Sequence, residues 1–369
     1  MSQINIRNLC NENEDGAPTI VGVSTFSATS YMCPPKGTTA QRPQNPVSGS
    51  LRFNTDTASL EYYRGDTLNW TQIEMTSPDL GGGARGIYAM SYQPSTSDRI
   101  EYITIPTLGN ATDFGNLTVA RKFGGAAASR TRGCWAGGQP SQVTIDYVTI
   151  SSTGDAIDFG DRTQAATEID GLSTEIRGVF AGGYAAPAMR DTMDYITIAS
   201  TGNAVDFGNL SAGRGSQGQC AGASSTRGLW AGGQWTSPIA VNTIEYITVA
   251  STGNSADFGD LFTGQSTNAY GGATTSTKMY CMGTATADTG VITIATLGNA
   301  TDFGGDMDMG GSYNAAAGSP TRGVCAGAAP GVNTIKYIDY ATASDGIDFG
   351  DLTGVASGMK GLSNAHGGL

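Results

Sequence analysis

The sequence predicts an all-β fold, and composition, short-range periodicity and an internal repeat all point to it. Glycine accounts for 54 of the 369 residues and charged residues for only 14%, whereas disordered chains are rich in charge. Glycine shows no period of three and there are only 13 prolines, which excludes collagen. Runs such as EYITI (101–105) alternate with the period of a strand, and no stretch sustains a helical period. We therefore expect glycine-rich turns between many short strands.

A repeat with several landmarks groups these strands. The triplet DFG occurs six times at steps of 45 to 51 residues, with its phenylalanine at Phe114, Phe159, Phe207, Phe258, Phe303 and Phe349. A strand-like run precedes each copy, and its second residue is tyrosine in five repeats but Val291 in the fifth. An arginine–glycine turn lies further upstream in five repeats, and the fifth repeat has Lys278-Met279 there. Four strands in each of six units predict a six-bladed β-propeller.

Each unit is expected to begin with an inner strand of small residues, such as GGAAAS (124–129), because backbones approach closely around a central channel. A tight turn leads to a second strand that ends in two glycines. A variable loop, a third strand and an STGN-type turn then lead to the fourth strand, which contains DFG. The chain enters the propeller at the second strand (86–93), so residues 360–369 are predicted to supply the missing first strand and close the ring.

The paired glycines carry a family resemblance. Motifs such as WAGGQ (135–139) and FAGGY (180–184) are followed by T-[IM]-[ED]-Y strands. With these motifs, residues 82–369 resemble the kelch propeller family, which implies a kelch-like β-propeller. The DFG phenylalanine replaces the usual kelch tryptophan late in each blade, and Gly283-Thr284 has lost one glycine of the pair. These departures weaken any transfer of kelch function, but they leave the fold prediction standing.

Two repeated side chains are expected to have structural roles. The DFG phenylalanine is expected to pack between blades, and the aspartate to bond a neighbouring turn. A kinase role for DFG is excluded, because the sequence has no H-R-D loop. The arginines of the arginine–glycine turns are expected to bond turn carbonyls or the acids of the next blade.

Residues 1–80 lie outside the repeat and are predicted to form a segment separate from the propeller (81–369). Within 33–74, the stretches SLRFNTDT, SLEYYRGD and NWTQI indicate a small β-hairpin module. The stretch resembles a module of tailed-bacteriophage virion proteins, with the pattern G-T-T-x-x-R-P, G-x-[IL]-R-[FY]-N-T-D-T, E-[YF]-[YF]-x-G and W-x-x-[IL]. The attachment residues implied by this resemblance are Arg42, Pro43, Arg52, Phe53, Asn54, Asp56, Tyr62 and Trp70.

The resemblance implies a tail-fibre, baseplate or capsid-decoration protein, made in the host cytoplasm and located in the virion. Its N-terminal segment would contact other virion proteins and its propeller would project outward. Attachment to a symmetric particle implies a homo-oligomer, with a trimer favoured by the resemblance. Two alternatives stay open: a bacterial kelch-like scaffold that gathers protein partners, and a propeller enzyme that degrades glycans.

The loops between second and third strands vary in length and composition and are expected on one face. Variable loops on a rigid scaffold are typical of binding surfaces, here for a host-surface glycan or protein. The alternative is that nothing constrains these loops. The candidate contact residues are Tyr92, Gln139, Tyr184 and Trp235.

Several functions are excluded by what the sequence contains. The net charge of −12 argues against nucleic acid and anionic membrane surfaces as partners. There is no long apolar run and no visible signal peptide, so membrane insertion is not expected. His366 is the only histidine and is expected to be exposed or at a strand edge, while the acids follow the repeat. No catalytic residue, metal site or cofactor is therefore predicted, and the six cysteines are expected to be small buried hydrophobes.

Overall fold

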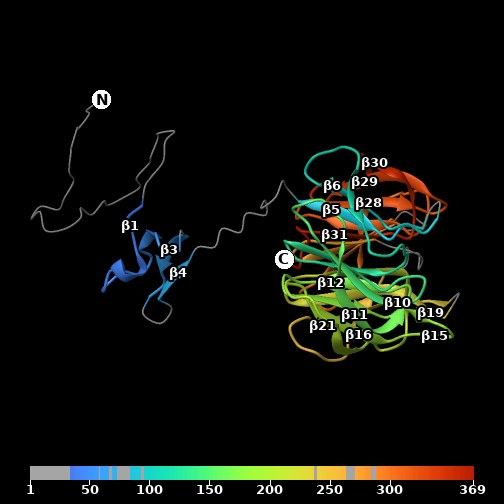
Figure 1. The fold of residues 1–369 in the computed structure, drawn as a ribbon, viewed down its shortest axis with the longest axis horizontal. Coiled ribbons are helices and arrows are strands. Elements are labelled where there is room, and N and C mark those ends of the chain that lie inside the picture. Colours follow the sequence, from blue (N-terminus) through green and yellow to red (C-terminus); the bar gives the residue numbers. More distant parts are fainter. Residues whose placement is uncertain are drawn as a thin grey trace, which may run out of the picture. The chain divides into compact units, whose positions relative to one another are not determined.

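A computed structural model of the chain describes residues 34–57, 59–65, 69–72, 84–92, 95–236, 239–262, 271–283 and 288–369, apart from the side chains of 216–219, 235–236 and 239–240. This part of the chain consists of β-strands and one short 3₁₀ helix, which confirms the all-β prediction (Figure 1). The chain divides into two compact units, Met1–Thr76 and Ser77–Leu369. Across the described residues, no helix has the length and apolarity that a membrane crossing requires.

The first unit contains one four-stranded sheet. Its strands lie in the order β1 (Lys36–Gly37), β2 (Leu51–Asn54), β3 (Ser59–Tyr63) and β4 (Trp70–Gln72), and the 3₁₀ helix η1 (Thr39–Gln41) follows β1. Strand β1 is parallel to β2, and the other pairs are antiparallel. The β-hairpin predicted within 33–74 is thus present. Residues 38–42, which follow β1, lie beside this hairpin.

Among the described residues, the second unit contains six main antiparallel sheets, which we number I to VI; five have four strands, and sheet IV has a short fifth strand beside its four. Sheet I is β31 (Lys360–Ser363), β5 (Arg85–Ala89), β6 (Arg99–Thr104) and β7 (Thr112–Asn116). Sheet II is β8 (Gly125–Ala128), β9 (Arg132–Ala136), β10 (Gln142–Thr149) and β11 (Ile157–Ala166). Sheet III is β12 (Asp170–Ser173), β13 (Arg177–Ala181), β16 (Thr192–Thr197) and β17 (Val205–Asn209).

The remaining three sheets follow the same order of strands. Sheet IV is β18 (Gly215–Ala223), β19 (Arg227–Thr236), β21 (Thr243–Thr248) and β22 (Ala256–Asp260). Sheet V is β23 (Gly271–Thr274), β24 (Lys278–Met282), β25 (Asp288–Thr293) and β26 (Thr301–Asp306). Sheet VI is β27 (Ala315–Gly318), β28 (Arg322–Ala328), β29 (Val332–Asp339) and β30 (Ile347–Ala356). Short strands β14 (Tyr184–Ala185) and β15 (Ala188–Met189) form a hairpin, and β20 (Ile239–Ala240) pairs with β19.

Sheet I is assembled from the two ends of the second unit. Strand β31 pairs antiparallel with β5, with Lys360 opposite Ala89 and Ser363 opposite Gly86. Figure 1 shows these two strands side by side although they are far apart in the sequence. The prediction that residues 360–369 supply the missing first strand is confirmed. The first strands contact one another in the cyclic order β31, β8, β12, β18, β23, β27 and back to β31.

One hydrogen bond recurs at all six junctions between consecutive sheets. A backbone N–H just after DFG in one sheet donates to an Asn or Asp side chain in a turn of the next sheet, at 2.9–3.1 Å. The donor and acceptor pairs are Asn116–Asp155, Asp161–Asn203, Asn209–Asn254, Asp260–Asn299, Asp306–Asp345 and Asp351–Asn110.

The glycine of DFG is required by this close approach in five sheets, and in sheet V the next residue, Gly305, makes the approach instead. Gly115 has a φ of 147°, and a Cβ there would lie 2.3 Å from the carbonyl oxygen of Gly154 in the next sheet. Only glycine tolerates both the conformation and the contact. The prediction for the aspartate is wrong, because Asp113 is exposed and the bond instead joins the backbone of Asn116 to the side chain of Asp155.

A second set of contacts joins four junctions through a buried acid. Asp146 accepts bonds from the N–H (3.1 Å) and hydroxyl (2.6 Å) of Thr118 in the preceding sheet, and pairs with Arg121 at 3.0 Å. Such buried ions persist only when they are paired and hydrogen-bonded. The equivalent groups elsewhere are Asp194 with Thr163 and Arg162, Glu245 with Ser211 and Arg214, and Glu101 with Thr353 and Arg99.

Among the described residues, the two junctions that flank sheet V lack this buried acid. At the junction of sheets IV and V, Phe262 takes the place of the hydroxyl residue and Gly290 takes the place of the acid. At the junction of sheets V and VI, Lys336 replaces the acid and its Nζ donates to the carbonyl oxygen of Asp308 at 2.6 Å. Sheet V is therefore the sheet whose side-chain contacts with its neighbours differ most from the common pattern.

The hydrophobic core lies between neighbouring sheets. Trp135 in sheet II is fully buried and packs with Ile87, Ile100 and Phe114 of sheet I. Burying each such aromatic side chain contributes about 2–3 kcal/mol. The DFG phenylalanine thus packs between sheets as predicted, with its ring edge on to the tyrosine of its own sheet, as for Tyr102 and Phe114 at 5.8 Å.

Candidate functional site

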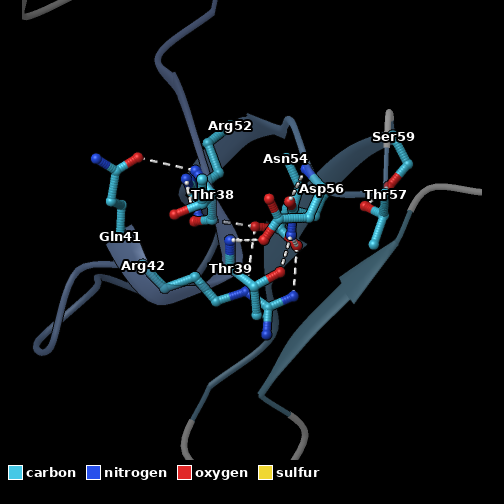
Figure 2. A network of polar contacts seen from close by, with 10 residues as sticks. Thr38, Thr39, Gln41, Arg42, Arg52, Asn54, Asp56, Thr57 and Ser59 are labelled. Carbon is cyan, nitrogen blue, oxygen red and sulfur yellow. Dashed lines mark hydrogen bonds and ion pairs between the residues drawn. The ribbon is translucent and has the colours of Figure 1, made fainter.

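The polar core of the first unit is centred on Glu61 in β3. Its carboxylate is fully buried and accepts hydrogen bonds from Arg42 (Nε 3.2 Å, Nη2 2.6 Å), Arg52 (Nη1 3.0 Å) and Asn54 (Nδ2 3.1 Å). Figure 2 shows these three side chains converging from different parts of the unit. The hydrogen bonds from Arg42, opposed in part by burial, lower the pKa of Glu61.

The same residues bind segment 38–42 to the hairpin. Arg52 Nη2 donates to the carbonyl oxygen of Thr38 at 3.0 Å, and Asn54 Nδ2 donates to Thr39 Oγ1 at 3.0 Å. The backbone N–H of Thr39 donates to Asp56 Oδ2 at 2.9 Å (Figure 2). Four predicted attachment residues (Arg42, Arg52, Asn54 and Asp56) therefore belong to one network. Glu61 lies within the phage-like motif, but the sequence does not mark it as the centre.

The other predicted attachment residues line the surface of the first unit. Pro43 is exposed, and Phe53, Tyr62 and Trp70 are half-buried. The ring of Trp70 lies 5.5 Å from that of Tyr63 and 5.8 Å from the guanidinium of Arg52. Two apolar side chains are also exposed in this unit, Val47 at 77% and Leu51 at 39%.

In the second unit, an aromatic cluster lies among the linkers between sheets and the loops that follow second strands, on what we call the loop face. Lys122 Nζ lies 3.4 Å from the ring centroid of Tyr92 and 5.4 Å from that of Phe123. The ring of Phe123 is 6.1 Å from Tyr92 and 5.7 Å from Tyr313. Partial burial lowers the pKa of Lys122, and its ammonium gains cation–π contacts in return. These four residues form the loop-face cluster.

The backbone of this cluster adopts an unfavourable conformation. Phe123 and Tyr313 have φ values of 56° and 62°, in the left-handed region that bulky residues rarely occupy. Such residues cost about 1–3 kcal/mol each and persist only where the surroundings hold them. Here Glu168 N–H donates to the Phe123 carbonyl at 2.6 Å, and Gly358 N–H donates to the Tyr313 carbonyl at 2.8 Å. The two rings are therefore rigidly placed.

The structure brings two predicted loop residues together and places a third one sheet further along. The ring of Tyr92 contacts the ammonium of Lys122. Gln139 and Lys122 exchange two backbone hydrogen bonds, at 2.7 and 3.2 Å. Gln139 is exposed and Tyr92 is 40% exposed. Tyr184 is half-buried and makes the equivalent backbone exchange with Thr167, at 2.6 and 3.0 Å. The side chain of Trp235 lies outside the described residues.

Sequence reasoning missed Lys122, Phe123 and Tyr313. A positional signal was nonetheless available, because Phe123 and Tyr313 each lie two residues before a first strand, where the last repeat has Gly358. A bulky residue at a glycine position indicates local strain, but the repeat alone does not show that Phe123 and Tyr313 meet.

The opposite face, which we call the turn face, carries the turns between first and second strands. There, each arginine of the arginine–glycine turns donates through Nη1 to a carbonyl of the next sheet at 2.7–3.1 Å. Each also lies 4.6–4.8 Å from the tyrosine ring of its own sheet. The predicted bond to carbonyls is confirmed, with pairs Arg85–Ile150, Arg132–Ile198, Arg177–Val249, Arg227–Ile294 and Arg322–Ile105.

Contacts bridge the first strands near both ends of the space between them. Lys360 pairs with Asp170 at 3.1 Å between β31 and β12, and burial raises the pKa of Asp170. At the turn face, His366 Nε2 lies 3.0 Å from the carbonyl oxygen of Ala128 and 3.2 Å from Ser173 Oγ. The remaining cavities of about 60 and 40 Å³ have room for only a few waters.

His366 differs from its predicted setting. It is half-buried, and Gly368 N–H donates to its Nδ1 at 3.1 Å, so Nε2 carries the hydrogen donated to Ala128. Burial lowers its pKa to about 4, which keeps the ring neutral. The expectation of an exposed or strand-edge histidine is wrong, because residues 364–369 fold back over the first strands after β31 ends.

The cysteines in the described part of the second unit are free and buried. They are Cys134, Cys220, Cys281 and Cys325, while Cys10 and Cys33 lie outside the described residues. Burial raises the pKa of Cys134 to about 12, so this thiol is unreactive. The prediction of small buried hydrophobes is confirmed for these four.

No family model matches this chain, and no curated protein matches it. Solved structures do match, among them one titled "Structure of YjhT". Its similarity to this chain has a TM-score of 0.49 at 8% sequence identity, and the match covers 57% of this chain and 73% of the other. A likeness this slight says nothing about ligands or partners, which have to be inferred from the chain's own contacts.

Proposed function

We propose that this chain is a non-enzymatic structural protein of a tailed-bacteriophage virion, of tail-fibre, baseplate or capsid-decoration type. In this proposal the first unit contacts other virion proteins. The second unit is a six-bladed kelch-like β-propeller that projects from the particle and contacts the host surface through its loop face. Symmetric attachment makes the protein a homo-oligomer, with a trimer favoured.

The observation that carries the proposal is the network around Glu61. Arg42 comes from the first stretch of the phage-like motif and Arg52 and Asn54 from the second, and all three meet on the buried carboxylate of Glu61 in the third. Residues that share a motif because they build one polar core support a true module rather than a chance match. The network also leaves Pro43 and the apolar side chains of Val47 and Leu51 on the surface, where they are suited to bury against a partner.

Two cyclic features support the six-bladed propeller. The first strands of sheets I to VI contact one another in a closed order, and a bond from strand four to the next turn recurs at each junction. The pairing of β31 with β5 completes sheet I from both ends of the unit. These are the contacts that a closed ring of blades requires.

The loop-face cluster supports a binding role for the propeller without catalysis. Tyr92 presents an exposed aromatic ring beside the Lys122 ammonium, as is typical of contact residues in interfaces. The buried acids and arginines described above are instead engaged with each other between sheets, as in Asp146 with Arg121. They hold the fold and are not poised for acid–base chemistry.

Immunogold electron microscopy on the source lysate tests the virion assignment. We expect an antibody to the second unit to label particles at one kind of location, and sedimentation of the purified protein to give a trimer mass. Protein found only in the particle-free fraction would contradict the proposal.

A glycan and host-envelope binding assay tests the loop face. We expect Tyr92→Ala to reduce binding about tenfold or more, because it removes the exposed ring of the cluster. Ile176→Ala is the matched control, since Ile176 is 66% exposed but follows a first strand, on the turn face. Equal loss in both variants would remove the loop face from the proposal.

A further inference from the structure

The junction of sheets V and VI breaks the pattern of the turn face at four positions. Lys278 takes the place of the turn arginine, and Val291 takes the place of the tyrosine on which that arginine lies. On the sheet VI side, Tyr340 stands where five sheets have isoleucine or valine, and Asp339 stands where they have threonine. All four changes concern one end of one junction.

These changes replace the contact made at the five arginine junctions, and a cavity lies at this altered end. At those junctions the guanidinium spans from its own tyrosine to a carbonyl of the next sheet. Here Tyr340 instead stacks on Tyr280, with ring centroids 4.0 Å apart and planes at 10°. A cavity of about 640 Å³ lies here, lined by Thr277, Lys278, Tyr280, Thr321, Asp339 and Tyr340, and by Ala365, His366, Gly367 and Leu369. Its volume lies within the range of small-molecule sites, roughly 300–1,000 Å³.

The charged groups of the cavity keep hydrogen-bonding capacity. Among the described residues, the ammonium of Lys278 has no hydrogen bond or ion pair, and it lies beyond ion-pair distance from Asp339. One oxygen of Asp339 accepts the N–H of Ala341 at 2.9 Å, and a second oxygen is left. The cavity thus offers a strong donor and a strong acceptor at separate places on its wall.

We propose that this cavity binds a neutral hexopyranose unit. Sugar hydroxyls both donate and accept, so one ring can bond Asp339 and Lys278 at the same time. The apolar C–H face of the ring suits tyrosine walls, which combine an apolar body with a polar tip. An anion would meet Asp339 in a protein of net charge −12, a cation would meet Lys278, and an apolar molecule would desolvate both charges without bonds. The inference stands independently of the virion assignment.

Titration of the purified full chain with three methyl pyranosides, the α-glucoside, α-mannoside and β-galactoside, tests the site by ligand-observed NMR. We expect saturable binding of at least one glycoside, with a dissociation constant near 1 mM. The variant Lys278→Arg/Val291→Tyr rebuilds the regular junction, and we expect it to weaken that binding at least tenfold. The matched control is Arg227→Lys/Tyr246→Val, which introduces the same two residue types into sheet IV. It should leave the dissociation constant within twofold of the wild-type value.

Lack of saturable binding of all three glycosides overturns the proposal, and so does wild-type affinity in Lys278→Arg/Val291→Tyr. If circular dichroism shows that this double variant is unfolded, Asp339→Thr replaces it. That change restores the residue of the other sheets and should weaken binding at least fivefold, and unchanged affinity there overturns the site as well. The binding assay does not depend on where the protein resides, so its outcome is separable from that of the particle labelling.

Discussion

Sheet V and the other five sheets show two ways of joining the same backbone. The bond from strand four to the next turn is present at all six junctions, so this backbone contact does not depend on the side chains that differ. In the described part of the chain, the buried acid, its hydroxyl donor and its arginine occur together at four junctions. Where the acid is absent next to sheet V, the hydroxyl is absent too, as Gly290 and Phe262 show. Buried polar partners can therefore be absent together, whereas the loss of one partner alone leaves the other unpaired.

The largest expected effect comes from removing one partner at a regular junction. Asp146→Ala leaves the buried guanidinium of Arg121 without its carboxylate partner and Thr118 without its acceptor, and we expect a loss of about 3–5 kcal/mol in the free energy of unfolding. Urea denaturation followed by tryptophan fluorescence measures it. Asp113→Ala, at an exposed acid of the neighbouring sheet I, should change the stability by less than about 0.5 kcal/mol. Equal effects of the two variants would show that the buried acid does not stabilise the junction between the sheets.

A smaller effect is expected from the turn arginines. Arg177→Lys loses the bond to the Val249 carbonyl and the planar contact with Tyr195, and we expect a cost of about 1–2 kcal/mol. In contrast, Lys278→Ala in sheet V removes a side chain without a protein partner among the described residues, and should cost less than about 0.5 kcal/mol. Thermal unfolding of both variants checks the difference, and similar costs would contradict the comparison.

The dependence of stability on pH tests the contribution of His366, which contacts sheets II and III at the turn face. Its folded pKa of about 4 lies below the unfolded value of about 6.5, so the unfolded state binds more protons between these values. The stabilising contribution is therefore complete above pH 6.5 and declines as the pH falls toward 4. Melting temperatures between pH 4 and 7 should show this slope, and His366→Gln should flatten it. A slope that persists in the variant would assign it to other groups.

The smallest effect on the whole chain concerns the first unit. Hydrogen bonds from Arg42 lower the folded pKa of Glu61, so the carboxylate stabilises this unit above its unfolded pKa of about 4.3. That stability is lost as the pH falls through the lower, folded pKa. We expect acid-induced change in Trp70 fluorescence to begin at higher pH in Arg42→Gln, with the second unit unaffected. A midpoint that does not move would show that Arg42 is dispensable.

Much of the fold follows from local pattern, and much of the site does not. Alternation and glycine spacing predict the strands, and the phase of the repeat predicts that residues 360–369 complete sheet I. The phage-like motif predicts the hairpin of the first unit, but not that Glu61 is its centre, because that depends on which side chains meet after folding. The same holds for Lys122, which meets Tyr92 across two loops. The sequence does not predict the setting of His366, because no periodicity extends beyond β31.

The pairing of β31 with β5 has a consequence for the order of folding. Sheets II to VI are each made from one contiguous stretch and can form as that stretch leaves the ribosome. Sheet I cannot, because β5 is made early and its partner comes about 270 residues later, so closure is slow and involves a large loop. Until then β5 presents an unpaired edge, the kind of surface on which nascent chains associate wrongly. Translation that stops before residue 360 would therefore yield a product prone to aggregation rather than a slightly shorter protein.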